Sequence, residues 1–551
     1  MPLNSLQESV AGAAVSKTPM TNPVLWWRDG IIYQIYPRSF QDTTNDGVGD
    51  LRGIERRLDY LASLGIAAIW ISPFYPSPMA DFGYDVADYR GVDPLFGTLA
   101  DFDSLLAAAH GRNLKVILDF VPNHTSSEHP WFLAARSSRT DLKRDWYLWR
   151  DPGPNGGPPN NWMSQFGGPA WTFDQATGQY YYHSFLKEQP DLNWRNPEVR
   201  KAIYNSMAFW LDKGVDGFRM DVLWLLIKDD QFRDNPPNPD WKPGQSTSWS
   251  VLPRYTADQP ETHKIVAEMR ALCDTYAERV LIGEIYLPLQ ELVAYYGRPD
   301  TLDGADMPFN LHLIETEWNA DRIAQLITSY ELLLPSGAWP NWVLGNHDQP
   351  RMASRLGPAQ ARVAAVLLLT LRGTPTMYYG DELGLPNAHI APGQVRDPAE
   401  KNQPGIGMGR DPERSPMPWD SGPGFGFTTA EHPWLPFVDN TAEFTVEHEA
   451  SDRASFLSLY RQLLVLRREH PALSEGAIKQ VQSANGVLSY HRAYPEQNEG
   501  KTIQVYLNLT DSKQAIPPVN AQVLLTSYLD GEGRVDVFET LRPNEGIVLL
   551  L

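Results

Sequence analysis

The sequence is poor in cysteine and has no long apolar run. Its 551 residues include one cysteine, Cys273, so no intramolecular disulfide and no thiolate zinc site can form. No stretch reaches the roughly 18 consecutive apolar residues of a membrane span. Residues 1–22 lack the basic start and apolar core of a secretion signal. These absences predict a cytoplasmic protein, and we interpret Cys273 as a small buried apolar residue.

Basic residues are scarce relative to acidic ones. Lysine and arginine total 47 against 67 aspartates and glutamates, which gives a formal net charge of −20. Such a charge argues against nucleic-acid and membrane partners and leaves neutral substrates open. Aromatic residues, in contrast, make up 11% and include 18 tryptophans. Flat rings pack against the C–H faces of sugars, so this composition weakly favours a carbohydrate site, although most of the rings are expected in the core.

From residue 31 onward, short apolar strands alternate with amphipathic helices. Strand-like runs are predicted at 31–36, 66–71, 116–121, 215–221, 280–285, 342–346 and 374–379. Such alternation predicts an α/β fold with a parallel sheet covered by helices, and about eight units suit a (β/α)₈ TIM barrel. A doubly wound open sheet fits less well, because no glycine-rich phosphate loop follows the first strand.

Two segments interrupt this alternation and a third follows it. Residues 123–193, after the third strand, are rich in Gly, Pro, Asn and Trp and predict a small inserted domain, and residues 386–440 predict a lid. Short strand-like runs from about residue 475 predict a C-terminal antiparallel β-sandwich domain. The predicted organisation is a disordered tail 1–24, barrel segments 25–122 and 194–472, the inserted domain 123–193 and a β domain 473–551.

Polar residues gather at the predicted ends of the strands, where the active site of such a barrel lies. They are Asp119, Asn123 and His124 after the third strand, Arg219 and Asp221 after the fourth, Glu284 after the fifth, and His347 and Asp348 after the seventh. Any one of them alone is better explained as a structural salt bridge, but the whole set predicts a catalytic site, since burying it only for packing would be costly. Because alternate strand residues face the same side, Arg219 is expected beside Asp221, where its charge would lower the pKa of that carboxyl.

These stretches resemble the α-amylase family, glycoside hydrolase family 13. The matching segments are 119–124, 217–221, 283–284 and 345–348, together with 65–73 and 373–382. The resemblance implies that Asp221 is the nucleophile, that Glu284 is the general acid and then the base, and that Asp348 binds sugar hydroxyls. A retaining mechanism needs the two reacting carboxyl groups roughly 5–5.5 Å apart. His124 and His347 are implied to donate to sugar hydroxyls; taken alone, they would be structural or metal-binding.

Within the family, the chain is most similar to the oligo-1,6-glucosidase and α-glucosidase group. The segments that carry this similarity are QPDLN at 189–193, DFGY at 81–84 and the arginine-containing segment 410–419 in the lid. The resemblance implies that Asp81, Tyr84 and Arg410 seal the pocket on the terminal glucose, with Phe185 and Gln189 in its wall. Without the resemblance, a plain surface ion pair would explain Asp81 and Arg410 equally well.

The acceptor side departs from the group. Val222, directly after the implied nucleophile, goes with tolerance of α-1,6 links in this group. The following Leu223 and Trp224 stand where the group has Ile-Asn or a similar pair. The resemblance therefore leaves the acceptor side undefined.

The loop 42–50 is a candidate metal site. Asp42, Thr44, Asp46, the Val48 carbonyl and Asp50 place oxygens at the spacing of the start of a calcium loop, although the glutamate of position twelve is absent. A similar loop in the α-glucosidase group implies a structural Ca²⁺ or Mg²⁺. The alternative is a solvated Asp-rich turn.

The predicted function is a retaining, exo-acting α-glucosidase that cleaves short oligosaccharides or other α-glucosides and transfers the glucosyl unit. No organic cofactor is implied, and a monomer or a homodimer is expected. A sucrose isomerase or trehalose synthase is the alternative within the family. A non-catalytic sugar-binding or transporter-associated relative is the alternative from another class.

Overall fold

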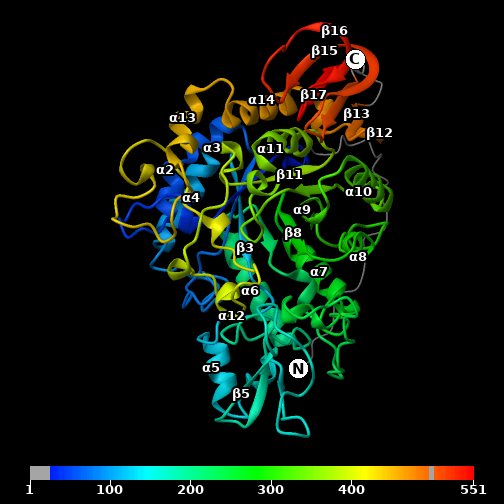
Figure 1. The fold of residues 1–551 in the computed structure, drawn as a ribbon. Helices are drawn as coiled ribbons and strands as arrows, with labels where there is room; N and C mark the ends of the chain where they lie inside the picture. The colour runs from blue at the N-terminus through cyan, green and yellow to red at the C-terminus, as the bar shows by residue number, and fades with distance from the viewer. Residues whose placement is uncertain (1–24, 495–501) are drawn as a thin grey trace, which may run out of the picture.

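An eight-stranded parallel sheet forms the centre of the protein, and helices surround it (Figure 1). The computed structural model describes residues 25–494 and 502–551; the tail predicted at 1–24 lies outside them. The strand order is β10-β11-β1-β2-β3-β7-β8-β9, and the outermost strands β10 and β9 contact each other, which nearly closes the sheet into a barrel. The predicted (β/α)₈ barrel is confirmed. Its strands are β1 (Ile32–Ile35), β2 (Ala68–Ile71), β3 (Lys115–Phe120), β7 (Gly217–Met220), β8 (Val280–Ile285), β9 (Met307–Asn310), β10 (Asn341–Val343) and β11 (Thr374–Tyr378).

Helices cover the outside of the barrel. They are α2 (Leu51–Arg56), α3 (Leu58–Leu64), α4 (Leu99–His110), α6 (Pro197–Lys213), α7 (Pro260–Cys273), α8 (Leu289–Ala294), α10 (Ala320–Leu333), α11 (Met352–Thr370) and α14 (Phe456–Glu469). Alternate strand residues separate the two sides of the sheet: Trp70 and Ile117 belong to the cluster inside the barrel, whereas Ile69 and Val116 pack in the large cluster with the helices. Burial on both sides explains why these strands are continuous apolar runs.

The helix before the fourth barrel strand has clear start and stop signals. The side chain of Asn196 accepts a hydrogen bond from the Glu198 N–H, and Pro197 occupies the first helical position of α6. Gly214 ends the helix with φ 102°, a left-handed conformation that suits glycine. The chain then enters β7, so these residues set where the end of that strand emerges.

One barrel strand was not predicted from the sequence. β9 consists of Met-Pro-Phe-Asn and pairs with β8 so that Pro308 lies opposite Gly283. A short run with an internal proline carries no strand signal, because proline cannot donate to the ladder. Its place next to β8 comes from the closure of the barrel.

Two long segments of the chain lie outside the barrel, one between β3 and β7 and one after β11. Between β3 and β7 the chain forms α5 (Pro130–Ser137) and a small antiparallel sheet of β4 (Trp149–Arg150), β6 (Gln179–Tyr182) and β5 (Trp171–Asp174). This part lies at the end of the molecule opposite the C-terminal domain in Figure 1. After β11 the chain runs through short turns, α12 (Pro398–Asn402) and α13 (Val446–Ser451) before α14.

The C-terminal domain is antiparallel, as predicted, but its described strands form a single sheet and not the two sheets of the predicted β-sandwich. Its six strands, in the order β12-β13-β14-β17-β15-β16, form one sheet. Along β14, Val505 and Leu507 join the main core on the barrel side, while Tyr506 joins a second apolar cluster with Phe538. Both faces are therefore covered. The strands are β12 (Ala477–Ala484), β13 (Val487–Ala493), β14 (Ile503–Asn508), β15 (Gln514–Thr526), β16 (Val535–Leu541) and β17 (Gly546–Leu550).

Two expectations drawn from scarce features are met. Cys273, at the end of α7, is fully buried, and burial raises the pKa of its thiol to about 12, so it is an inert core residue. Among the helices of the described residues, none has the length and apolarity needed to cross a bilayer.

Candidate active site

Two of the predicted catalytic carboxylates lie at the C-terminal ends of neighbouring strands. Asp221 follows β7, and its N–H donates to the Phe120 carbonyl of β3 at 2.8 Å. Glu284 lies near the end of β8, which pairs with β7 so that Met220 is opposite Gly283. This parallel register places positions 221 and 284 next to each other at the barrel rim.

One arginine bridges the carboxylates at this rim. Nη1 of Arg219 lies 2.8 Å from Oδ1 of Asp221 and 2.8 Å from Oδ1 of Asp119. Its Nη2 lies 2.9 Å from Oε1 of Glu284, whose Oε2 accepts a 2.8 Å hydrogen bond from the Val222 N–H. The guanidinium is fully buried, so its position is fixed by these contacts. We refer to this group as the Arg219 cluster.

The Arg219 cluster keeps protons that isolated carboxyls would lose. Burial raises the pKa of Asp221 well above its usual value, and the Glu284 charge raises it further. Burial also raises the pKa of Glu284. Arg219 acts to lower the pKa of Asp221, as expected, but burial and the Glu284 carboxylate outweigh it, so the pKa is raised overall. Interacting carboxyls of this kind titrate as a pair, so their apparent pKa values belong to the pair and not to either residue alone.

A second arginine bridges carboxylates on the opposite side of the cavity. Nη2 of Arg410 lies 2.7 Å from Oδ1 of Asp81 and 2.7 Å from Oδ1 of Asp397, and its Nη1 lies 3.2 Å from Oδ1 of Asp348. Arg414 adds a contact of 2.8 Å to the same Asp348 oxygen. We refer to this group as the Arg410 cluster. The ion pair between positions 81 and 410 is thus buried rather than a surface pair.

Two of the three carboxylates in the Arg410 cluster have lowered pKa values, whereas burial raises the pKa of the third, Asp81. Burial acts to raise the pKa of Asp348, but the charges of Arg410 and Arg414 outweigh it and hold that pKa below its usual value. Burial likewise acts against ionised Asp397, and Arg410 again reverses the direction, so its pKa is lowered. Two guanidinium groups therefore face three carboxylates in the Arg410 cluster, whereas one guanidinium faces three in the Arg219 cluster.

His347 and Tyr84 form a stacked pair between the two clusters. Their rings are 5.3 Å apart and nearly parallel, at 5°. His347 Nε2 lies 2.7 Å from the Tyr84 hydroxyl, which donates to Asp119 Oδ2 at 2.9 Å, and 3.3 Å from Asp348 Oδ2. Burial lowers the pKa of His347 well below its usual value, so the ring is neutral. This pair connects the Arg219 cluster with the Arg410 cluster.

His124, Gln189 and Phe185 form the adjoining wall. The Gln189 side-chain N–H donates to Asp81 Oδ2 at 3.2 Å, and its Nε2 lies 3.2 Å from His124 Nε2. The rings of His124 and Phe185 are 5.3 Å apart. Burial lowers the pKa of His124 to about 4, so it is neutral and offers one ring N–H.

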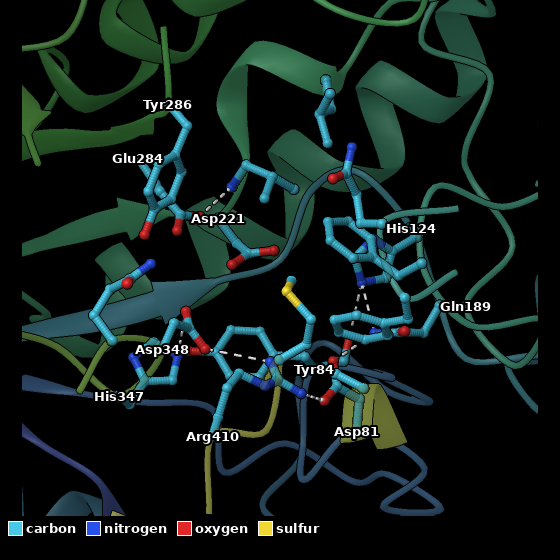
Figure 2. A pocket seen from close by; sticks show the side chains of 18 of the residues that line it. Asp81, Tyr84, His124, Gln189, Asp221, Glu284, Tyr286, His347, Asp348 and Arg410 are labelled. Atoms are coloured by element: carbon cyan, nitrogen blue, oxygen red, sulfur yellow. Dashed lines mark hydrogen bonds and ion pairs between the residues drawn. The ribbon is translucent and has the colours of Figure 1, made fainter. Parts of the chain in front are cut away.

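These side chains surround one cavity of about 350 Å³ (Figure 2). That volume falls within the range of roughly 300–1,000 Å³ typical of small-molecule sites. Figure 2 shows Asp221 and Glu284 facing this space from one side and Asp81 and Arg410 from the other. Arg219 contacts both carboxylates but does not line the cavity itself. The predicted residues that line the cavity are Asp81, Tyr84, His124, Phe185, Gln189, Asp221, Glu284, His347, Asp348 and Arg410.

Sequence reasoning missed several residues of the site. Arg414 lies in the lid segment 410–419, so that similarity could have indicated it. Asp397 carries no sequence signal beyond its place as the cap of α12. Further cavity residues that were not predicted are Phe166, Trp249, Tyr286, Glu315, Gln349 and Met408.

The loop 42–50 satisfies its carboxylates with its own hydrogen bonds. Asp42 accepts from the backbone N–H groups of residues 44, 45 and 47, and Asp50 accepts from those of residues 43 and 53. Within residues 25–494 and 502–551, no group of three or more His, Cys, Asp or Glu side chains could hold a metal ion. The arrangement therefore does not fit a carboxylate-rich metal site, and the Ca²⁺ or Mg²⁺ implied by the resemblance stays a prediction.

Comparisons with known proteins agree with this geometry. Residues 34–476 match the family described as "Alpha amylase, catalytic domain". A probable α-glucosidase of Rhizobium meliloti is 42% identical, covering 85% of this chain and 87% of its own length. An oligo-1,6-glucosidase of Heyndrickxia coagulans is 36% identical, covering 96% of this chain and 99% of its own length.

Solved structures give the same fold over nearly the whole chain. The α-glucosyl transfer enzyme XgtA superposes with a TM-score of 0.89 and 39% identity, covering 95% of this chain and 99% of that one. The trehalulose synthase MutB of Pseudomonas mesoacidophila MX-45 superposes with a TM-score of 0.86 and 34% identity, covering 95% and 99%. The family match and these relatives show that the chain is a glycoside hydrolase and belongs to the α-amylase family.

Proposed function

We propose that this glycoside hydrolase is a retaining, exo-acting α-glucosidase that releases α-glucose from the non-reducing end of short α-glucosides. One observation carries the proposal: Asp221 and Glu284 contact the two Nη atoms of one buried guanidinium at the wall of a single cavity. The opposite wall holds the buried ion pair of Asp81 and Arg410. A cavity closed in this way supports removal of one terminal sugar at a time.

In the first step, Asp221 attacks the anomeric carbon and forms a covalent glucosyl-enzyme. The bond to the leaving oxygen breaks, and that oxygen takes the proton held by Glu284. Arg219 Nη1 supports the ionised form of the nucleophile at 2.8 Å. The raised pKa of Glu284, which burial causes, keeps a proton available for this transfer.

In the second step, Glu284 acts as a base and takes a proton from water, whose oxygen attacks the same carbon from the side the leaving group vacated. The bond between that carbon and the Asp221 oxygen breaks, and its electron pair returns to the carboxylate. Two inversions give net retention. An alcohol that reaches the glucosyl-enzyme before water gives glucosyl transfer by the same step. Ionised Asp348 and the neutral His347 and His124 are assigned to the sugar hydroxyls, and Tyr84 to stacking on the ring.

The proposal is tested by NMR of early products from maltose, isomaltose, sucrose and 4-nitrophenyl α-glucoside in parallel. We expect α-glucose as the first anomer, together with transfer products at high substrate concentration. β-Glucose as the first anomer would contradict retention. A wild-type protein that is inert on every α-glucoside would favour a non-catalytic sugar-binding relative.

A second candidate has one specific observation in its favour. The likeness to trehalulose synthase MutB, at a TM-score of 0.86, supports an enzyme that rearranges sucrose. An isomer of sucrose as the main product, with little free glucose, would favour this candidate or a trehalose synthase acting on maltose.

We also propose a cellular location and an oligomeric state. The composition supports a cytoplasmic enzyme that acts as a monomer or homodimer without nucleic-acid or membrane partners. Fractionation of the source cells and light scattering of the purified protein test these two points.

A further inference from the structure

The mouth of the cavity has an aromatic and aliphatic wall that the proposed hydrolysis does not use. Val222, Trp224 and Leu225, directly after the nucleophile, all line the cavity. Trp249, from the turn η4 (Thr247–Ser250), lines it as well. Trp224 is 9% exposed and Trp249 is 48% exposed, so the second ring is largely open to solvent. Because these residues line the same cavity as Asp221 and Glu284, we place the leaving group or acceptor against this wall.

The Trp224 side of the wall is held rigidly against the reacting groups. Val222 has a φ of 37°, an unfavourable left-handed conformation for a β-branched residue, and its N–H donates to Glu284 at 2.8 Å. Trp224 follows two residues later in the turn η3 (Leu223–Leu225). The backbone that orients the general acid therefore also places this ring.

The turn that carries Trp249 is fixed from two sides. The Thr247 N–H and the Ser246 hydroxyl both donate to Gln403 Oε1, at 3.1 and 2.9 Å. The Thr247 hydroxyl accepts from the Gly168 N–H at 2.9 Å. These bonds join the turn to the lid and to the inserted segment. An exposed tryptophan on a fixed turn is preorganised for a flat or apolar partner, because little side-chain entropy is lost on binding.

The chemistry of this wall distinguishes between acceptors. A sugar hydroxyl pressed against Val222 and Leu225 loses its hydrogen bonds to water and finds no side-chain partner in those two residues. Trp224 has one polar side-chain atom, Nε1, and it is buried. An aryl or alkyl group loses none and gains apolar contact. Polar contacts for a sugar are still offered by Glu315 and Gln349, which line the same cavity.

We propose that the acceptor site of this enzyme prefers alcohols that carry an aromatic or apolar group over sugars, and that Trp249 determines this preference. The inference rests on the proposed glucosyl-enzyme. In the transfer step, the bond between the Asp221 oxygen and the anomeric carbon breaks and its electron pair returns to the carboxylate. The alcohol oxygen bonds to that carbon, and its proton passes to Glu284.

The test uses α-glucosyl fluoride as the donor, because it loads the enzyme without occupying the acceptor site with a leaving group. Benzyl alcohol, cyclohexylmethanol and methyl α-glucoside compete with water for the same glucosyl-enzyme, and the ratio of transfer to hydrolysis is measured against acceptor concentration. We expect benzyl alcohol to reach half-maximal transfer at a concentration about tenfold below that of methyl α-glucoside.

The variants test the residue assignment. Trp249→Ala is expected to lower the transfer-to-hydrolysis ratio for benzyl alcohol by about tenfold, and Trp249→Phe to retain most of it. Leu252→Ala is the matched control, since this residue is 43% exposed on the same segment but does not line the cavity. If Trp249→Ala fails to fold, the wild-type acceptor series and Trp249→Phe still decide the question.

The outcomes separate the two proposals. Wild-type enzyme that turns over the fluoride but transfers to methyl α-glucoside as well as to benzyl alcohol overturns the acceptor proposal alone. An unchanged ratio in Trp249→Ala overturns the role of that ring. Failure to hydrolyse the fluoride at all overturns the proposed function, and the acceptor proposal with it.

Discussion

The Arg219 and Arg410 clusters face each other across one cavity with almost the same composition. In each, a buried arginine contacts three carboxylates: Asp119, Asp221 and Glu284 in the first, and Asp81, Asp348 and Asp397 in the second. They differ in origin, because the first arginine lies on a barrel strand and the second on the segment after β11.

The two clusters also differ in proton affinity. Burial raises the pKa of all three carboxyls around Arg219. Around Arg410, the pKa values of Asp348 and Asp397 are lowered, and Arg414 supplies a second cation to Asp348, while burial raises the pKa of Asp81.

The Asp348 side chain is 23% exposed against 9% for Asp221, so the two clusters differ in burial as well as in cations. The comparison teaches that the ratio of cations to carboxylates and the burial of the carboxyls together decide whether a cluster stores a proton or a fixed charge. Acid–base chemistry needs a stored proton, and hydrogen bonding to neutral hydroxyls needs a fixed charge.

The largest effect is expected from removing the nucleophile. Asp221→Asn should reduce kcat on 4-nitrophenyl α-glucoside by about 10⁴-fold or more, because no covalent intermediate can form. Stopped or initial-rate assays measure the loss, and circular dichroism checks that the fold persists. Activity within tenfold of wild type would mean that another group attacks.

Replacing the general acid Glu284 should slow substrates with poor leaving groups more than substrates with good ones. Glu284→Gln should reduce cleavage of methyl α-glucoside by about 10²–10⁴-fold, whereas α-glucosyl fluoride, whose leaving group needs little protonation, should lose much less in the glucosylation step. Single-turnover rates on both substrates give the comparison. Equal losses on the two donors would contradict the assignment of the acid.

On the other side of the cavity, charge should matter less than geometry. Arg410→Lys keeps a cation but cannot span Asp81, Asp348 and Asp397 together, so kcat/KM on maltose should fall by about 10²-fold. Arg396→Lys, an exposed change in the same lid, is the matched control. An unchanged kcat/KM in Arg410→Lys would show that the cluster supports only the fold.

The pH profile should report the Arg219 cluster and not the Arg410 cluster. In the active form, Glu284 carries a proton and Asp221 does not. We therefore expect kcat/KM to fall at low pH, when Asp221 is protonated as well, and at high pH, when Glu284 loses its proton. Because burial raises the pKa of Glu284 above its usual 4.5, the alkaline limb should lie above the ordinary carboxyl range, with about a tenfold loss per pH unit beyond it.

Glu284→Gln should lose this alkaline limb on α-glucosyl fluoride while the acidic limb remains. Asp348, with its lowered pKa, stays ionised throughout and adds no limb. A wild-type alkaline limb that persists in the variant would assign the lost proton to another group.

The smallest effect is expected at the third acidic region, the loop 42–50. Its aspartates make no ion pair among the described residues and are satisfied by N–H groups instead. Chelation with EDTA should therefore lower Tm by no more than about 2 °C, which corresponds to about 2 kcal/mol for a chain of this size. A larger drop that Ca²⁺ or Mg²⁺ reverses would establish the metal that the sequence predicts.

The sequence by itself determined the local relations of the site. Arg219 and Asp221 share a side because strand residues alternate, and each predicted catalytic carboxylate follows a strand-like run, so the barrel and its rim could be inferred. Strand β9 could not, since a run with an internal proline becomes a strand only when its neighbours close the barrel.

Only the tertiary structure decided the electrostatics. Asp397 and Arg414 reach Asp348 and Arg410 through the path of the lid, and the net rise in the pKa of Asp221 comes from burial and from Glu284 on another strand. Local sequence determines which side chains a segment carries and which side they face. Burial and charge, in contrast, are sums over every group that the fold brings near, and most of those groups are distant in the chain.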